Sequence, residues 1–333
     1  MQYATNAHPP PAAGSTERIG SAFGKVILLG EHAVVYGSAA IVLGIDRGAT
    51  ARAWPETEGV SRLAIGSADP VTSDGDSDLA RAFAALLEAC EVTSPVRVLA
   101  ETELPAGAGL GCSAALGVAV ARALDAYMGR ALRSAGDVSR AARAWEAVFH
   151  GNPSGVDAAA AARGGCLFFR KEGPDGASIK HIRLCAPLSL AIGHSGQSSS
   201  TRAMVEQVAD LHKKKPAIVD RSMAAIDSLV QNARLALEAG DLVGLGRLMN
   251  LNQMLLSGLL LSTEEIETMC RLARDAGALG AKLTGSGGGG CVVALAEDAE
   301  PILAAWQKEG FHSFSTRVSL DGDAARPSGG DAS

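Results

Sequence analysis

The first third of the chain shows the apolar runs of β-strands. Segments 19–29, 39–54 and 96–102 are rich in Val, Ile, Leu and Ala and are bounded by glycine, proline or polar residues. Runs of this kind are typical of strands that are buried in a sheet. We therefore expect a sheet in this part of the chain, with its first strand interrupted at residues 24–25.

Helical spacing of apolar residues appears next. Three segments show it: 77–90, 113–127 and 137–150. Asp137 is placed to accept hydrogen bonds from the free backbone amides at the start of the third segment. Segment 201–276 is also largely helical, and Gly240 and Gly277 are expected helix ends because glycine readily adopts the left-handed conformation found there.

The remaining apolar runs predict a mixed second half. Expected strands are 164–170, 189–194, 281–284, 291–296 and 312–319, and 298–308 is an expected helix. Because strands and helices are mixed rather than strictly alternating, we predict an α+β fold. The change of pattern near 185–190 indicates two domains, 18–187 and 188–320. The polar, aperiodic tails 1–17 and 321–333 are expected to be disordered.

Composition limits the classes of function. Of the 333 residues 47% are hydrophobic, which is enough for a substantial core, and 30 basic against 36 acidic residues give a net charge of −6. This balance disfavours broad binding to nucleic acid or to an anionic membrane. No apolar run reaches the roughly 18 residues that span a bilayer, and the six cysteines form no disulfide or metal pattern. We therefore expect a cytoplasmic protein with reduced thiols.

Three glycine-rich segments carry candidate chemistry. The first, GKVILLGEHAVVYG at 24–37, places Lys25, Glu31 and His32 beside an apolar strand. Charged groups are costly to bury without a partner. From this segment alone, a functional site and a hairpin with Lys25 and Glu31 facing solvent both remain open.

The second segment, PAGAGLGCSAA at 105–115, leads directly into an Ala-rich helical pattern. Glycines let backbone N–H groups converge and the helix N-terminus adds a partial positive charge, so phosphate oxygens can bind there. No Lys-Ser or Lys-Thr pair follows the glycines, so the segment is not a Walker A loop. We favour a phosphate cradle over a plain strand-to-helix turn.

The third segment, KLTGSGGGG at 282–290, matches the spacing G-x-G-x-x-G. An apolar strand follows it instead of a helix, and too little chain remains for a dinucleotide-binding half. Consecutive glycines instead indicate a loop that is approached closely by a ligand or by another loop.

Acidic residues between these loops complete a set suited to phosphoryl transfer. The chain from Glu146 to Asp157 leaves a helix and enters a turn with Asn-Pro and Ser-Gly signals. Phosphoryl transfer to an alcohol needs positive groups and Mg²⁺ on the phosphates, and a group that orients or deprotonates the hydroxyl. Ser113 and Glu146 offer oxygen ligands for Mg²⁺, and Asp157 beside Lys25 offers the proton acceptor. For each acid alone, the ordinary alternative is favoured, with Glu146 facing solvent on its helix and Asp157 making only a local turn hydrogen bond. The combination of all the groups is what favours a site.

Taken together and in this order, the segments resemble the GHMP kinase superfamily, the small-molecule kinases named for galactose, homoserine, mevalonate and phosphomevalonate. The match spans about residues 19–296. The three glycine-rich segments are similar to the first motif, the ATP-phosphate loop and the third motif of the family. GNPSGVD at 151–157, with segments 200–202 and 249–253, favours the mevalonate kinase branch, which serves isoprenoid synthesis.

The resemblance implies a fold and a role for each candidate residue. The fold would be an N-terminal domain similar to ribosomal protein S5 domain 2 and a C-terminal ferredoxin-like domain, with the site between them. Asp157 would be the base or hydroxyl-orienting carboxylate, Lys25 its charge partner and a phosphate ligand, and Ser113 and Glu146 the Mg²⁺ ligands. The ATP-binding set would be Lys25, Pro105, Gly107, Ala108, Gly109, Leu110, Gly111, Cys112 and Ser113. The mevalonate-binding set would be Glu31, His32, Thr201, Gly285 and Gly287.

Two positions depart from the family pattern. The usual Pro-Gly-Lys is Phe23-Gly24-Lys25 here, which preserves the lysine. The usual Ser-Ser pair is Cys112-Ser113, which favours Ser113 as the metal ligand because a thiol is a poor partner for Mg²⁺. Other acceptors (phosphomevalonate, homoserine or a sugar), phosphorylation coupled to decarboxylation, and a nucleotide-binding protein without turnover remain alternatives. The sequence leaves the oligomeric state open, a homodimer included.

Overall fold

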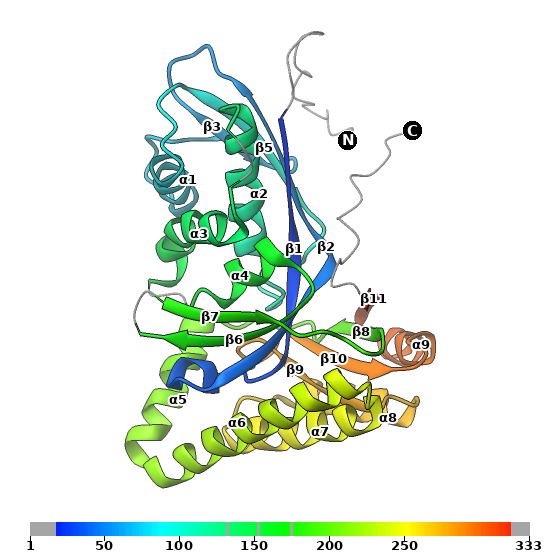
Figure 1. Ribbon diagram of the computed structural model, residues 1–333. Coiled ribbons are helices and arrows are strands. Elements are labelled where there is room, and N and C mark those ends of the chain that lie inside the picture. The colour runs from blue at the N-terminus through cyan, green and yellow to red at the C-terminus, as the bar shows by residue number, and fades with distance from the viewer. Residues whose placement is uncertain (1–17, 131–132, 152–153, 174–175, 321–333) are drawn as a thin grey trace.

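Two β-sheets form the frame of the protein (Figure 1), as a computed structural model shows for residues 18–130, 133–151, 154–173 and 176–320. The predicted α+β architecture is confirmed. The tails predicted at 1–17 and 321–333 lie outside the described residues.

The first sheet is built mainly from the N-terminal half. Its strands are β1 (Arg18–Leu29), β2 (Ala39–Pro55), β3 (Arg62–Ile65), β4 (Val71–Thr72), β5 (Val96–Thr102), β6 (Cys166–Glu172) and β7 (Gly176–His181). They follow the order β4-β3-β5-β2-β6-β7, with β1 paired to β2, and only β3 and β5 run parallel. β1 is continuous, although its register shifts between Phe23 and Gly24, so the predicted interruption is a bulge. The short strands β3, β4 and β7 were not predicted.

Helices cover one face of this sheet (Figure 1). They are α1 (Asp78–Ala89), α2 (Cys112–Tyr127), α3 (Ala135–His150) and α4 (Val156–Arg163), and a short 3₁₀ turn η1 (Ala33–Tyr36) follows β1. α2 packs against β1 and β2, and its Ala-rich sequence is buried on nearly every side. Small side chains allow this close approach of helix and sheet, which places the start of α2 beside β1.

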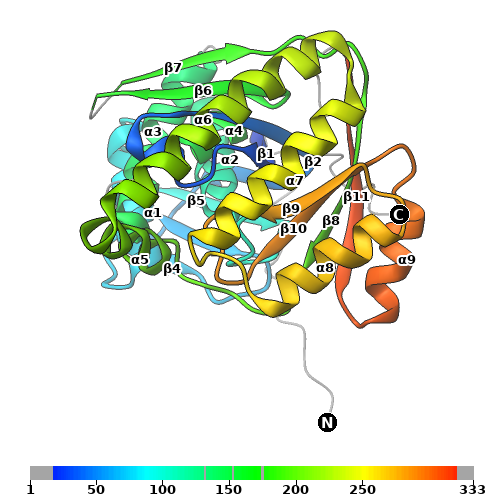
Figure 2. The same ribbon diagram turned by 90° about the horizontal axis from the view of Figure 1, so that it is seen from below.

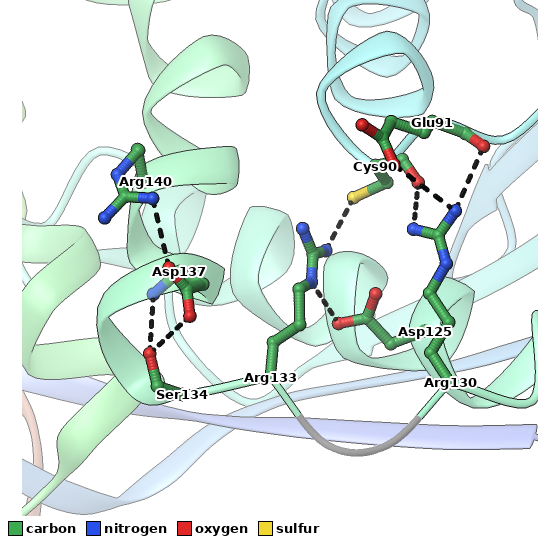
Figure 3. Close-up of polar contacts among 8 residues, drawn as sticks. All are labelled: Cys90, Glu91, Asp125, Arg130, Arg133, Ser134, Asp137 and Arg140. Carbon is green, nitrogen blue, oxygen red and sulfur yellow. Dashed lines mark hydrogen bonds and ion pairs between the residues drawn. The ribbon is translucent and has the colours of Figure 1, made fainter.

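The connection between α2 and α3 corrects one prediction (Figure 3). Ser134, and not Asp137, caps α3: its Oγ accepts a hydrogen bond from the Asp137 N–H at 3.2 Å and donates one to the Asp137 carboxylate at 2.6 Å. In the same connection, Arg133 contacts the Asp125 carboxylate at 2.7 Å and the Cys90 Sγ at 3.1 Å. These contacts tie the end of α1 to α2 and α3.

The second sheet contains β8 (Leu188–His194), β9 (Gly280–Thr284), β10 (Cys291–Ala296) and β11 (His312–Val318). Its antiparallel order is β11-β8-β10-β9. With helices between β8 and β9 and between β10 and β11, this is the β-α-β-β-α-β arrangement of ferredoxin-like folds. The sheet begins at β8, and the domain division after residue 187 stays a prediction.

The helices of the second half are α5 (Thr201–Lys214), α6 (Pro216–Ala239), α7 (Leu242–Gly258), α8 (Glu264–Asp275) and α9 (Glu300–Lys308). α6, α7 and α8 lie below β9 and β10 of the second sheet in Figure 1, and Figure 2 shows these helices from below. Pro216 begins α6, where its missing N–H is harmless, and Gly240 ends it with a φ of 73°, as predicted. Within the described ranges, every helix is too short or too polar to span a membrane.

Candidate active site

Lys25 lies inside the protein, near the middle of β1. Its side chain is only 4% exposed, so the solvent-facing alternative is wrong. Its backbone N–H donates to the Leu110 carbonyl at 2.9 Å, which joins β1 to the second glycine-rich segment. A methyl group on Gly111 would lie 2.8 Å from Lys25 Cγ, and Gly111 has a φ of 75°. Glycine at this position therefore lets the lysine stem run along the turn.

Asp157 faces the ammonium group of Lys25. α4 begins at Val156, after Gly155 in the left-handed conformation, so Asp157 occupies the first turn of a helix and not the predicted turn. Its Oδ1 lies 3.0 Å from Lys25 Nζ, while the side chain keeps 33% exposure. The partial positive charge of the helix start stabilises a carboxylate there. Residues 152–153 of the predicted motif lie outside the described residues.

Glu146 on α3 is the buried acid of the site. Its side chain is buried, and its Oε2 has no hydrogen-bond partner in the described part of the chain. Burial, and then the charge of Asp157, raise the pKa of the Glu146 carboxyl to about 8, against the opposing charges of Lys25 and Arg143. A buried carboxylate oxygen without a partner is destabilising, and a bound divalent cation would satisfy it.

Ser113 lies in the first turn of α2 and contacts α3. Its Oγ accepts a hydrogen bond from Trp145 Nε1 at 3.2 Å, and Trp145 directly precedes Glu146. The adjacent Cys112 contacts β5 instead, with its Sγ 3.8 Å from Thr102 Oγ1. Of this pair, the serine is therefore the one that contacts the helix carrying Glu146.

The donor set fits Mg²⁺ bound together with phosphates. A serine hydroxyl and a carboxylate are oxygen ligands, and Mg²⁺ usually keeps waters and substrate phosphates as its other ligands. Across the described ranges, no group of three or more His, Cys, Asp or Glu side chains is arranged to hold a metal by itself.

The second glycine-rich segment forms a tight turn ahead of α2. Gly107, Gly109 and Gly111 all have positive φ, a conformation that other residues rarely adopt. α2 begins at Cys112, and the first backbone N–H groups of a helix have no partner within it. The turn and these N–H groups form the positive end that the sequence predicts for phosphate binding.

A cavity of about 370 Å³ brings several of the candidate groups together, but Ser113 is not among the described residues that line it. Lys25, Glu146, Asp157 and Gly109 line it from the first half of the chain. Thr201, in the first turn of α5, lines it from the second half. The cavity therefore lies between segments that are far apart in the sequence.

The third glycine-rich segment makes close contacts with other loops. A methyl group on Gly285 would lie 3.3 Å from Gly109 Cα, so the second and third segments touch through bare backbone. At Gly287 a methyl group would lie 2.4 Å from the Leu261 carbonyl oxygen, which accepts a hydrogen bond from the Gly288 N–H at 2.8 Å. Gly285 lines the cavity, whereas Gly287 is not among the described residues that do. Loop-to-loop contact therefore accounts for most of these glycines.

His32 and Glu31 have different surroundings. His32 lines the cavity, and its Nε2 lies 2.8 Å from the Ser286 carbonyl oxygen. Because a carbonyl only accepts, Nε2 carries the proton, and burial lowers the pKa of His32. Glu31 is fully buried: it forms an ion pair with Lys282 of β9 and accepts a hydrogen bond from Asn252 of α7 at 3.2 Å. Glu31 therefore joins the two halves of the protein and, unlike His32, is not among the residues that line the cavity.

Comparison with known proteins places the chain in a family. Models of the GHMP kinases N terminal domain and the GHMP kinases C terminal match residues 78–165 and 233–312. The mevalonate kinase of Thermococcus sibiricus is 32% identical over 329 residues, covering 91% of this chain and 97% of that protein. The chain belongs to the GHMP kinase family.

Further similar proteins have the same name. The mevalonate kinase of Methanothermobacter thermautotrophicus is 37% identical over 279 residues, covering 82% of this chain and 88% of that protein. The crystal structure of L. major mevalonate kinase in complex with R-mevalonate has 30% sequence identity and a TM-score of 0.78, covering 93% of this chain and 98% of that one.

Sequence reasoning missed part of the wall of this GHMP kinase cavity. Lys171, Arg202, Val34 and Val35 line it and were not candidates. Arg202 belongs to the segment 200–202 that the resemblance had singled out. Lys171 is the next-to-last residue of β6, and no sequence signal marks it as a site residue.

Proposed function

We propose that this GHMP kinase transfers the terminal phosphoryl group of ATP to the primary hydroxyl of mevalonate, a step toward isoprenoids. The observation that carries the proposal is the ion pair of Lys25 and Asp157 in the cavity, beside the glycine turn at the start of α2. The names of the relatives support mevalonate as the acceptor, and R-mevalonate is the ligand in the similar L. major structure.

The two ends of the reaction are served by different groups in this proposal. Asp157 accepts a hydrogen bond from the acceptor hydroxyl and so orients its oxygen toward the phosphorus atom. Lys25 balances the carboxylate charge and stabilises negative charge on the transferred phosphoryl group. The glycine turn and the start of α2 hold the phosphates through backbone N–H groups.

Mg²⁺ is the cofactor in this proposal, and it would neutralise charge on the ATP phosphates. Glu146 and Ser113 would hold it. The Oε2 of Glu146, which has no partner among the described residues, supports this role, because a cation would satisfy this buried oxygen and offset the burial that raises the pKa of the carboxyl. The net charge of −6 also disfavours nucleic acid as a substrate more than it disfavours the small molecules ATP and mevalonate.

The test is ADP release measured with a panel of acceptors. We expect release that depends on both mevalonate and Mg²⁺ and that exceeds release with phosphomevalonate, homoserine or galactose, without CO₂ from diphosphomevalonate. Preference for another acceptor, or ATP binding without turnover on any of them, would contradict the proposal.

Asp157→Asn tests the central residue. We expect kcat to fall by about 10² to 10⁴, the usual effect of losing an acid–base group. Asp137→Asn is the matched control, because Asp137 is an acid in the first turn of the neighbouring helix α3, and its carboxylate contacts Ser134 and Arg140 at the surface. Equal kcat values for Asp157→Asn and the parent enzyme would show that the role given to Asp157 is wrong.

A further inference from the structure

The charged side chains of the cavity wall include one cation without a partner among the described residues. Lys25 contacts Asp157 at 3.0 Å. Arg202 Nε lies 3.0 Å from Glu206 Oε1 on the same helix, and the Arg202 side chain is 77% exposed. Lys171 also lines the cavity, but its side chain forms no ion pair or hydrogen bond with any residue that the structure describes.

The position of Lys171 follows from the alternation of side chains along β6. Residues two apart in a strand share a face, so Lys171 lies on the same face as Phe169. Phe169 packs with Val34 and Val156 in an apolar cluster, and these two valines also line the cavity. Arg170 lies on the opposite face and contacts α6. The half-buried Lys171 therefore extends an apolar row to the cavity.

The ammonium group of Lys171 lies at the end of an apolar wall, so the two together are complementary to a small carboxylate ligand with an apolar carbon chain. An ion pair formed there by charge-assisted hydrogen bonds is stronger than a neutral hydrogen bond, and the valines would contact the carbon atoms. The other cations are less available. Lys25 is already engaged with Asp157 at the reacting end, and Glu206 neutralises the exposed Arg202.

We propose that Lys171 binds the carboxylate of the acceptor and so makes the enzyme prefer a carboxylated alcohol over a neutral one. This inference rests on the function proposed above, since it names the residue that recognises one end of the acceptor. Lys171 is a specificity residue that touches substrate far from the transferred phosphoryl group, so its loss affects acceptor binding more than turnover.

The experiment compares mevalonate with 3-methylpentane-1,3,5-triol, which replaces the carboxylate by a neutral CH₂OH group. Lys171→Met keeps most of the length of the side chain and removes its charge, and Lys171→Arg restores the charge. Lys180→Met is the matched control, because Lys180 is exposed on the adjacent strand β7 and pairs with Phe168 on the other face of the sheet. Arg202→Gln tests the competing cation.

In Lys171→Met we expect the KM for mevalonate to rise by about 10- to 100-fold, the range for one hydrogen bond to a charged group. We expect kcat to change less than about threefold, and the KM for ATP and the kcat/KM for the triol to stay unchanged. The preference for mevalonate over the triol therefore falls by the same 10- to 100-fold. Lys171→Arg should recover most of it, and Lys180→Met should behave like the parent enzyme.

Three results would overturn the proposal. The first is an unchanged preference in Lys171→Met, and the second is an equal loss with both acceptors, which would indicate a structural role. The third is a loss of preference in Arg202→Gln but not in Lys171→Met. The function itself is tested separately by the parent enzyme: if it favours another anionic acceptor, the same comparison is made with that acceptor and its neutral analogue, and if it favours a neutral sugar, both proposals are wrong.

Discussion

Replacing Glu146 by glutamine should stabilise the metal-free protein while removing its activity. The carboxyl is buried, one of its oxygens has no partner among the described residues, and its pKa is raised to about 8 by burial and by the nearby Asp157. Glutamine has nearly the same shape and carries no ionisable proton. It therefore removes the unfavourable ionisation and, with it, the ligand proposed for Mg²⁺.

The size and sign of the effect follow from the two pKa values. A glutamate in the unfolded chain ionises near pH 4.5, whereas Glu146 in the folded protein ionises near pH 8. Between these values the folded protein binds more protons than the unfolded chain, so the free energy of unfolding falls as pH rises, by at most about 1.4 kcal/mol per pH unit. Above pH 8 the total loss in the free energy of unfolding is about 5 kcal/mol at most. Relaxation of the buried site makes the actual loss smaller.

The assay is urea denaturation of the parent and Glu146→Gln proteins from pH 5 to pH 9, in EDTA. We expect a difference below about 1 kcal/mol near pH 5 and a difference of about 2–5 kcal/mol in favour of the variant at pH 9. Glu88→Gln, at an exposed glutamate of α1, is the matched control and should follow the parent curve. Parallel curves for the parent and Glu146→Gln proteins would show that folding does not raise the pKa of the Glu146 carboxyl.

Two further changes test how the loops are held. Lys282→Met leaves the Glu31 carboxylate buried without its cation, so we expect the free energy of unfolding in urea denaturation to fall by about 3–5 kcal/mol. The double variant with Glu31→Gln should recover a large part of this loss. Equal losses in the single and double variants would contradict this. Gly111→Ala places a methyl group 2.8 Å from Lys25 Cγ at a φ of 75°, so we expect kcat/KM to fall at least about tenfold and stability by about 1–3 kcal/mol. Gly37→Ala has the same strain with no atom within 4 Å of the new methyl group, and it should keep its kcat/KM; matching kinetics for the two variants would mean that the collision with Lys25 is unimportant.

The long periodic segments were predictable because their pattern is local. The helix ending at His150 and the strands at 96–102 and 291–296 show a clear spacing of apolar residues, and the structure confirms them. The edge strands β4 and β7 are short or polar, and their pairing depends on neighbouring strands, so no period in their own sequence marked them. The helix containing Asp157 was missed because Asn-Pro and Ser-Gly are stronger local signals than its short run of alanines.

Candidate residues were predictable where a turn required glycine, or where an acidic residue followed a turn that contains glycine. The structure brings Lys25, Asp157, Glu146 and His32 to one cavity, which the spacing along the chain could not show by itself. Glu31 has the same kind of sequence context as His32, yet it belongs to a buried ion pair. The sequence does not show whether Glu31 lines the cavity or forms a buried ion pair, because its partner Lys282 lies 251 residues further along the chain.

The glycine turns, the start of α2 and the types of chemical group that are available follow from the amino-acid sequence alone, because backbone conformation and side-chain chemistry are local properties. Tertiary structure decided which charges are paired, which are buried and which face the cavity. Glu146 acquires a raised pKa and Lys171 a place on the cavity wall only through packing of distant segments. Burial and charge pairing depend on distances between elements, and those distances exist only in the folded chain.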